Sequence, residues 1–178
     1  MIATILAAQS TDERVNKITA ELFKKYPTLE NFAEANISEL ENDIKPVGFY
    51  KNKAKSIKET ARILVEKYNG TLPTTIEELV KLKGVGRKTA NVIMANIYGI
   101  PSIIVDTHCK RLSNRLGLVN SKDATKIEFE LKKIVEPQLY TIFSNLMVYH
   151  GRAVCKAIKP KCEVCTIKDV CEYFKARK

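Results

Sequence analysis

Apolar side chains recur at intervals of three and four residues along most of the chain, and this spacing limits the possible folds more than any other feature. Such stripes occur within residues 15–23, 54–64, 127–134 and 139–147. The spacing places them on one face of an α-helix, and we expect them to be buried in a core. The best strand candidate, residues 103–105, is too short to be convincing. The sequence therefore predicts an all-α fold.

Polar residues predict where several of these helices begin. A Ser, Asn or Thr followed three residues later by Glu forms a capping pattern, because its side chain accepts a hydrogen bond from the first helical turn. The pattern occurs at Ser10–Glu13, Asn36–Glu39 and Thr75–Glu78. We also expect helices over residues 88–98 and 106–117, the first closed by Gly99 and the second by Gly117.

Four of the five cysteines stand close together, at Cys155, Cys162, Cys165 and Cys171. A tight group within an odd total does not resemble the disulfide framework of a secreted protein. Four thiolates in one short loop can surround a single centre, and their tetrahedral sulfur ligation suits either Zn²⁺ or an iron–sulfur cluster. The residues alone leave both metals open. We predict a metal site in a reducing compartment, with Cys109 outside it.

Basic residues outnumber acidic ones, 30 to 20, which gives a formal net charge of +10. This excess favours a polyanionic partner, since each neutralised phosphate releases counterions. A soluble basic protein with no nucleic-acid role is the alternative. No segment approaches the ~20 consecutive apolar residues of a membrane span, so we expect a cytoplasmic protein without a membrane partner. Lysines also crowd the cysteine loop, where they could offset thiolate charge or face phosphates, at Lys156, Lys159, Lys161 and Lys168.

Residues 82–90, LKGVGRKTA, place two glycines between two predicted helices. Gly84 and Gly86 allow positive φ and a close approach of the backbone to a ligand. The next helix presents N–H groups and the positive end of its dipole to an anion. This turn, with Val85 and Arg87, could hold a DNA phosphate without reading bases. An ordinary connection between helices is the alternative.

Two residues have side chains suited to catalysis. Lys88 stands in the first turn after the glycines, and a lysine held neutral by its surroundings can attack carbon and form a Schiff base. A plain phosphate-binding lysine is the alternative. Asp106 is predicted to cap a helix, and its carboxylate could also stabilise positive charge on a sugar or help to activate a nucleophile. His108 and His150 could be ligands or acids, although core or surface positions are more typical of histidine.

The order of these motifs resembles the endonuclease III family of helix-hairpin-helix DNA glycosylases. LKGVGRKTANV is followed by VDTH, HGRAVC and the four-cysteine spacing, and AAQSTD and VGFYKNKA precede them. The resemblance covers essentially the whole chain. It implies two helical domains, a six-helix domain with the hairpin over residues 1–100 and a helical domain over residues 101–178 with a C-terminal cluster loop. It also favours a 4Fe–4S cluster over zinc on the four cysteines.

The resemblance implies a base excision repair enzyme for double-stranded DNA. Such an enzyme removes oxidised or damaged pyrimidines and cleaves the resulting abasic site by Schiff-base β-elimination. Lys88 would attack the sugar C1′, and Asp106 would be its carboxylate partner. Gln9 and Phe49 would fill and wedge the duplex after the target base is flipped out. Their alternatives are a polar residue near a helix cap and a core aromatic.

Two departures from the family pattern and two other functions bear on this interpretation. Lys83 replaces the usual proline before the first hairpin glycine, and the family has a helix ahead of residue 1 that packs in the cluster domain. We therefore expect a missing N-terminal segment or a compensating element. A mismatch glycosylase for adenine, thymine or uracil, and a non-catalytic DNA-binding module, are the other functions. We expect a monomer associated with the nucleoid.

Overall fold

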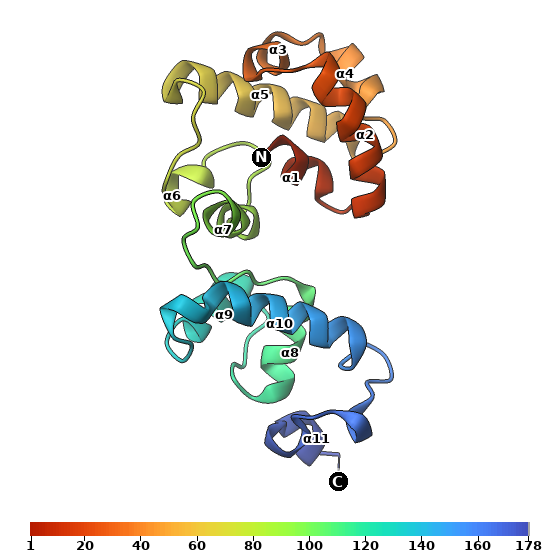
Figure 1. The fold of residues 1–178 in the computed structure, drawn as a ribbon, viewed down its shortest axis with the longest axis vertical. Coiled ribbons are helices and arrows are strands. Elements are labelled where there is room, and N and C mark those ends of the chain that lie inside the picture. The colour runs from red at the N-terminus through yellow and green to blue at the C-terminus, as the bar shows by residue number, and fades with distance from the viewer. Residues whose placement is uncertain (178) are drawn as a thin grey trace. The chain divides into compact units, whose positions relative to one another are not determined.

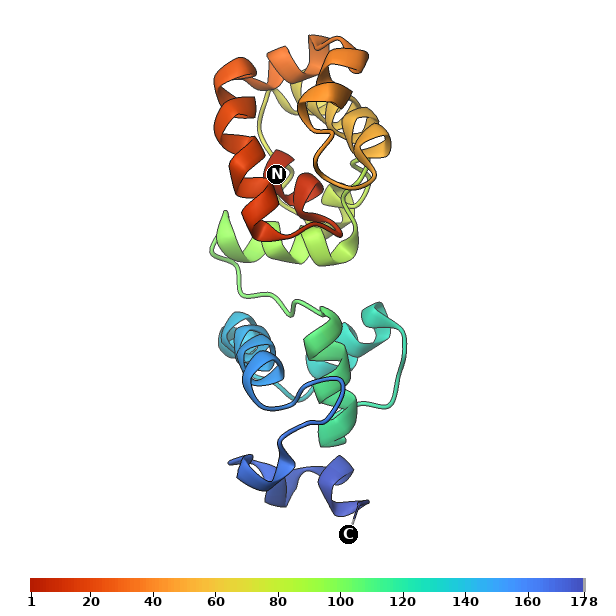
Figure 2. The same ribbon diagram turned by 90° about the vertical axis from the view of Figure 1, so that its right-hand side faces the viewer.

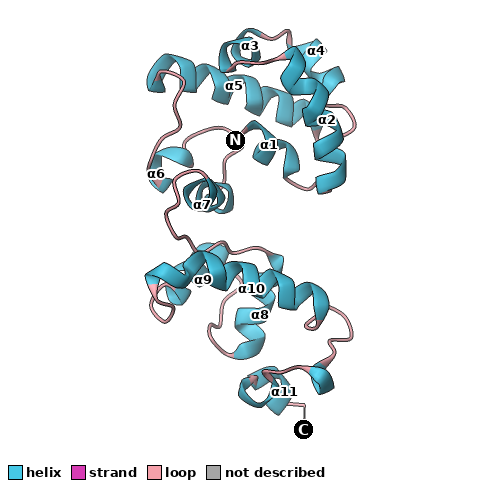
Figure 3. Ribbon diagram, viewed as in Figure 1, coloured by secondary structure: helices cyan, strands magenta, loops and turns pink. Residues whose placement is uncertain are grey.

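The computed structural model describes residues 1–177, and every regular element among them is a helix (Figures 1 and 3). The all-α prediction is confirmed. Residues 103–105 form no strand. The chain divides into two compact units, one comprising Met1–Ile93 and the other beginning at Met94. This division falls inside a helix, whereas the sequence analysis expected it after residue 100.

The first unit is organised around one long helix, α5. Figure 1 shows α3 above α5 and α1 below it, and α4 also packs against α5. Burying each large apolar side chain of this core contributes about 1.5–3 kcal/mol. Helices of this unit are α1 (Ile2–Ala7), α2 (Asp12–Lys25), α3 (Leu29–Glu34), α4 (Ile37–Asp43), α5 (Tyr50–Tyr68), α6 (Ile76–Leu79) and the first part of α7 (Arg87–Asn96). The fully buried side chains include Leu6, Leu40, Ile44, Ile57 and Leu64.

Of the three capping patterns with Glu, two form as predicted and one is wrong. The Asn36 side chain accepts hydrogen bonds from the N–H groups of Ser38 and Glu39, and Thr75 accepts one from Glu78. The capping box expected at Ser10 does not form, since α2 begins at Asp12 with Thr11 as its N-cap residue. The Ser10 hydroxyl instead accepts a hydrogen bond of 2.9 Å from the Lys53 ammonium, so a tertiary contact replaces the local one.

Helix α3 was not predicted, although it begins with a complete capping box. The Thr28 hydroxyl accepts from the Asn31 N–H at 3.3 Å, and the Asn31 side chain accepts from the Thr28 N–H at 3.2 Å. The third helical residue is Asn where the usual pattern has Glu or Gln, and this difference hid the signal.

The second unit packs α8 against α10, and Figures 1 and 2 both show these helices side by side. Gly151 allows the close approach, because a Cβ there would lie 2.5 Å from the His108 ring nitrogen Nδ1. The helices and 3₁₀ turns of this unit are α8 (Thr107–Leu116), α9 (Ala124–Leu131), η1 (Pro137–Leu139), α10 (Tyr140–Ala153), η2 (Cys162–Val164), η3 (Lys168–Val170) and α11 (Glu172–Lys175). Its core contains Ile103, Cys109, Leu112, Ile127, Leu131 and Met147.

Three apolar stripes are less buried than the sequence predicts: one ends on exposed Phe23, one ends on exposed Ile134, and the third runs along α10. Leu139, Ile142 and Leu146 are exposed, while Phe143 and Met147 pack against the core. The expectation of full burial is therefore wrong for the outer side of α10, because the core needs only one side of this helix. Within residues 1–177, no helix is long and apolar enough to cross a membrane.

The buried hydroxyl of Thr60 gives a test of this fold. It donates a hydrogen bond of 2.8 Å to the Lys83 carbonyl and is fully buried. Thr60→Val leaves that carbonyl without its donor and should lower the free energy of unfolding by about 1–3 kcal/mol in urea titrations. The Thr11 side chain makes no capping hydrogen bond, so Thr11→Val should lower it by less than about 0.5 kcal/mol. Equal losses from the two changes would contradict this assignment.

Candidate functional site

The glycine turn connects α6 to α7 and lies against α5. Gly84 has a φ of +79°, and a Cβ at this position would lie 2.9 Å from the Ser56 Cβ. Both observations require glycine here. Val85 is buried and anchors the turn, whereas Gly84 and Gly86 are exposed. The turn thus exposes the glycine backbone at the surface, while the buried Val85 side chain fixes its position.

Helix α7 begins directly after this turn. The first helical hydrogen bond runs from the Ala90 N–H to the Gly86 carbonyl at 2.9 Å. The N–H groups of the first turn therefore have no acceptor within the helix, and the helix dipole adds a partial positive charge there. Arg87 is half-buried and Lys88 is exposed in this turn. The arrangement suits an anion, as the sequence predicts.

Asp106 caps α8, as predicted. Its Oδ1 accepts a hydrogen bond of 2.7 Å from the Cys109 N–H, and the residue is half-buried. This bond fixes the orientation of the carboxylate at the start of the helix. Lys88 belongs to the first unit and Asp106 to the second, so the structure defines the surroundings of each within its own unit.

Gln9 and Phe49 share an unusual backbone conformation. Their φ angles are +56° and +58°, a left-handed region that non-glycine residues rarely adopt. Both side chains are exposed, Phe49 to 66%. The interpretation of Phe49 as a core aromatic is therefore wrong, and both side chains are available to a ligand.

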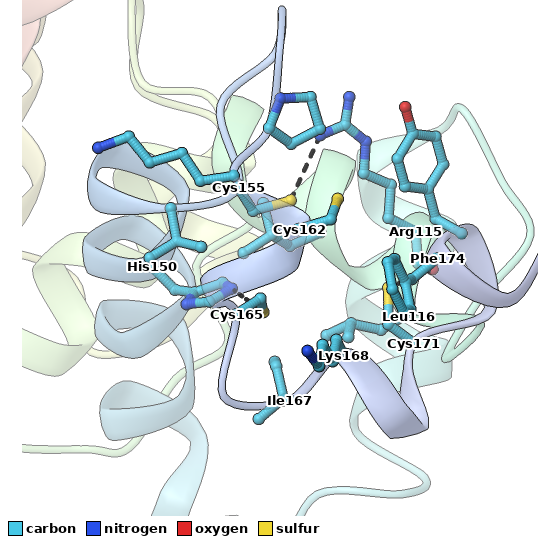
Figure 4. A pocket seen from close by; sticks show the side chains of 15 residues that line it. Arg115, Leu116, His150, Cys155, Cys162, Cys165, Ile167, Lys168, Cys171 and Phe174 are labelled. Carbon is cyan, nitrogen blue, oxygen red and sulfur yellow. Dashed lines mark hydrogen bonds between the residues drawn. The ribbon is translucent and has the colours of Figure 1, made fainter. Parts of the chain in front are cut away.

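The four clustered cysteines line one pocket of the second unit, and Figure 4 shows their sulfurs around it. Cys155 follows α10, Cys162 begins η2, Cys165 follows η2, and Cys171 precedes α11. None of the four forms a disulfide bond. Apolar side chains make up much of the remaining wall, among them Leu112, Leu116, Val154, Ile167 and Phe174.

The four thiols and the apolar wall of this pocket suit two kinds of metal centre. Zinc would draw all four sulfurs to within about 2.3 Å of one point. In an iron–sulfur cluster each cysteine would bind a different iron atom. The residues fit an iron–sulfur cluster, and their chemistry alone does not exclude zinc.

Arginine, rather than lysine, supplies the positive charge nearest the sulfurs. The Arg115 guanidinium donates to the Cys155 Sγ at 3.3 Å and to the carbonyls of Lys156 and Ala157 at 2.7 and 2.9 Å. It also lies 4.6 Å from the ring centroid of Tyr173. The Lys168 ammonium, expected to offset thiolate charge, donates instead to the Glu163 carbonyl. Sequence reasoning missed Arg115 because it precedes the first clustered cysteine by 40 residues.

Arg111 and the two histidines complete the contacts between α8, α10 and the cysteine loop. The Arg111 guanidinium donates to the Cys155 carbonyl at 2.9 Å and lies 3.1 Å from the His108 Nδ1. The His150 Nε2 lies 3.5 Å from the Cys165 Sγ (Figure 4). Arg111 and Arg115 are one turn apart on α8, and both side chains donate to the cysteine loop. Helix α8 therefore connects this loop to Asp106, which caps the start of the same helix.

Cys109 lies apart from the clustered cysteines. It is fully buried in the core of the second unit, and burial raises the pKa of its thiol to about 11. The thiolate is the reactive form, and it is scarce at neutral pH when the pKa is this high. Cys109 is therefore a packing residue.

Two family profiles match the chain. Residues 2–137 match the HhH-GPD superfamily base excision DNA repair protein, and residues 155–171 match the iron–sulfur binding domain of endonuclease III. The second match begins and ends on cysteines of the pocket. It identifies the four cysteines as ligands of an iron–sulfur cluster, and the 4Fe–4S prediction is confirmed.

Individual relatives agree along almost the whole chain. Endonuclease III of Synechocystis sp. is 47% identical over 172 residues, which cover 96% of this chain and 78% of the relative. Endonuclease III of Escherichia coli is 40% identical over 173 residues, which cover 97% of this chain and 82% of the relative. A solved structure of a trapped endonuclease III–DNA covalent intermediate has a TM-score of 0.91 at 43% identity, over 99% of this chain and 83% of that one. A thermostable thymine-DNA glycosylase has a TM-score of 0.85 at 28% identity, over 98% and 82%.

The contacts of Arg115 predict how the cluster depends on the protein around it. Arg115→Ala removes the donor to the Cys155 sulfur and frees two loop carbonyls, so cluster occupancy after chelator challenge should fall about tenfold. Iron, acid-labile sulfide and visible absorbance measure this directly. Arg152→Ala removes the same charge from an exposed position on α10 and should change occupancy little. Equal losses in the two variants would show that only net charge matters.

Proposed function

Because this chain belongs to the endonuclease III family of HhH-GPD base excision DNA repair proteins, we propose that Lys88 and Asp106 carry out its chemistry. The protein is a DNA glycosylase with abasic-site lyase activity that acts on damaged pyrimidines. The observation that carries the assignment of residues is the exposed Lys88 in the first turn of α7, directly after the glycine turn.

Lys88 acts as the nucleophile in this proposal. Its unprotonated amine attacks the sugar C1′, the C1′–N bond to the damaged base breaks, and the base leaves with a proton. Loss of a proton from the amine and opening of the sugar ring give a Schiff base between Nζ and C1′. Removal of a C2′ proton then expels the 3′ phosphate by β-elimination, and water releases the lysine. The exposure of Lys88 supports this role, since the amine must reach a sugar outside the protein.

Asp106 is the carboxylate partner of this reaction. A negative charge near the sugar stabilises the positive charge that develops as the base departs. The hydrogen bond from the Cys109 N–H to Oδ1 supports the role, because it orients the carboxylate before substrate binds. Preorganised charge is more effective than charge that must be rearranged during the reaction.

The turn Gly84–Arg87 holds the DNA backbone in this proposal, while Gln9 and Phe49 enter the duplex. The exposed glycine backbone and the start of α7 suit one phosphate group. The net charge of +10 favours binding to the phosphates along the rest of the duplex. Filling the space of a flipped nucleotide needs side chains that project from the surface. The exposure of Gln9 and Phe49 supports that use.

The iron–sulfur cluster cross-links the C-terminal loop through Cys155, Cys162, Cys165 and Cys171 when it is bound. Around it, the Arg111 and Arg115 side chains hold the loop carbonyls on α8, the helix that Asp106 caps. The chain's own residues thus connect the loop to the catalytic carboxylate.

We further propose that the substrate is duplex DNA with one damaged pyrimidine or abasic site, and that the protein acts as a monomer at the nucleoid. Solved structures of endonuclease III bound to DNA support duplex binding. The chain is also similar to a thymine-DNA glycosylase, so the rate of excision from a thymine mismatch should be compared with the rate from an oxidised pyrimidine. Faster excision from a mismatch than from an oxidised pyrimidine would overturn the preferred lesion but not the glycosylase assignment.

Borohydride trapping tests the nucleophile. Wild-type protein should give a covalent adduct with a duplex that carries one oxidised pyrimidine, because reduction fixes the Schiff base. Lys88→Gln should reduce the adduct to background, and DNA binding should persist because the helix end and the turn remain. Lys81→Gln removes a nearby exposed lysine and should trap normally. An undiminished adduct in Lys88→Gln would rule out this nucleophile.

Asp106→Asn separates the capping role from catalysis. Asn is as good an N-cap as Asp, so the free energy of unfolding should change by no more than about 0.5 kcal/mol. The lost negative charge should slow base excision at least about 100-fold in single-turnover assays. Asp106→Ala should lose activity and about 1 kcal/mol of stability together. If Asp106→Asn retained wild-type excision, the carboxylate would have only a structural role.

A further inference from the structure

The left-handed backbones of Gln9 and Phe49 need a structural cause. Strained φ values of this kind oppose folding by about 1–3 kcal/mol each, and they persist only where surrounding contacts fix the backbone. Among residues 1–177 only four non-glycine residues have positive φ. Two of them are the pair to which the proposed function assigns entry into the duplex. Lys53 stands on the helix that begins directly after Phe49, and its side chain reaches the segment that carries Gln9.

Lys53 contacts the segments on which both residues lie. It lies in the first turn of α5, where its backbone N–H makes the ordinary helical hydrogen bond of 3.0 Å to the Phe49 carbonyl, so the side chain is attached to the helix that Phe49 starts. Its ammonium donates to the Leu6 carbonyl at 2.8 Å and to the Ser10 hydroxyl at 2.9 Å. Leu6 and Ser10 flank Gln9 in sequence. A single residue therefore joins the Gln9 loop to the start of α5.

The environment of Lys53 makes these contacts strong. The side chain is only 6% exposed, and desolvation lowers the pKa of its ammonium. Burying an ammonium group without hydrogen-bond partners costs a large free energy. The Leu6 carbonyl and the Ser10 hydroxyl are the acceptors that offset this cost. The Leu6 carbonyl lies in the last turn of α1, where backbone carbonyls lack helical partners and the dipole is negative. Lys53 thus caps α1 from another helix and fixes where the Gln9 loop begins.

The same face of α5 also supports the glycine turn. Lys53, Ser56 and Thr60 follow one another at intervals of three and four residues, which places these three on one side of the helix. Ser56 lies against Gly84, and the Thr60 hydroxyl donates to the Lys83 carbonyl. One helix face therefore contacts both the Gln9 segment and the glycine turn.

We propose that Lys53 is a positioning residue for base flipping, which holds Gln9 and Phe49 in the arrangement in which both enter the duplex. The proposal rests on the proposed function, because it presupposes that these two side chains replace the flipped nucleotide. Lys53 itself is buried and does not touch DNA. It acts through the Leu6 carbonyl and the Ser10 hydroxyl, which fix the Gln9 segment against α5, the helix that begins directly after Phe49.

Lys53→Met tests the proposal, since methionine keeps the apolar stem and removes the donor. Excision of one oxidised pyrimidine from a duplex should fall about tenfold, which corresponds to the loss of one buried charged hydrogen-bonding group. The adenine analogue 2-aminopurine, placed opposite the lesion, should brighten less on binding because fewer duplexes are opened. Lys67→Met removes the same charge from the exposed far end of α5 and should leave both signals near wild type.

A mutant cycle distinguishes positioning from general destabilisation. If Lys53 acts through Gln9 and Phe49, adding Lys53→Met to Gln9→Ala/Phe49→Ala should slow excision little further. Independent, multiplicative effects would overturn the proposal, and so would a Lys53→Met variant with wild-type excision and fluorescence. Ser10→Ala removes one acceptor without changing the core, so it should give a smaller loss of the same kind even if Lys53→Met folds poorly. If Lys53→Met does not fold, a folded Ser10→Ala variant with wild-type excision and fluorescence would overturn the proposal.

Failure of the proposed function would look different. Wild-type protein that neither excised the lesion nor formed a trapped adduct on an abasic site would remove the premise, whatever the Lys53 variants did. If wild-type protein is active and the Gln9→Ala/Phe49→Ala double variant excises the lesion at the wild-type rate, the duplex-entry role and the positioning proposal are both contradicted. The lyase chemistry would stand in that case.

Discussion

The first unit depends on a simple constraint, namely that polar groups buried in a helix face must find hydrogen-bond partners. Lys53 and Thr60 are both buried on α5, and both donate to backbone carbonyls of other segments. Each of these hydrogen bonds fixes one segment, the end of α1 at Leu6 and the glycine turn at Lys83. The surface that faces DNA in the proposed function is thus held from beneath by the polar contacts of one helix.

The second unit follows the same principle with charged side chains. Arg111 and Arg115 donate to carbonyls of the cysteine loop and to the Cys155 sulfur. These bonds join the loop to α8, whose first turn is capped by Asp106. A cluster with thiolate ligands would add negative charge, which the Arg115 guanidinium would offset from 3.3 Å away at the Cys155 sulfur. The metal site and the carboxylate therefore share one supporting helix.

Local signals in the sequence were reliable where the partner lay within one helical turn. The caps at Asn36, Thr75 and Asp106 formed as predicted, because donor and acceptor are two or three residues apart. Ser10 does not cap α2, because its hydroxyl accepts a hydrogen bond from the Lys53 ammonium instead. The outer stripe of α10 failed for a related reason, as spacing shows which residues share a face but not whether another element covers it.

The sequence by itself determined the helical class, the cysteine quartet and the order of motifs that identifies the family, because periodicity and spacing are properties of the chain alone. It also singled out Lys88, Asp106, Gln9 and Phe49 as candidates. Only the tertiary structure revealed the supports of these residues. The partners of Lys53 lie 47 and 43 residues away, and Arg115 lies 40 residues from Cys155. Contacts at such separations arise when helices pack, and no local pattern in the chain encodes them.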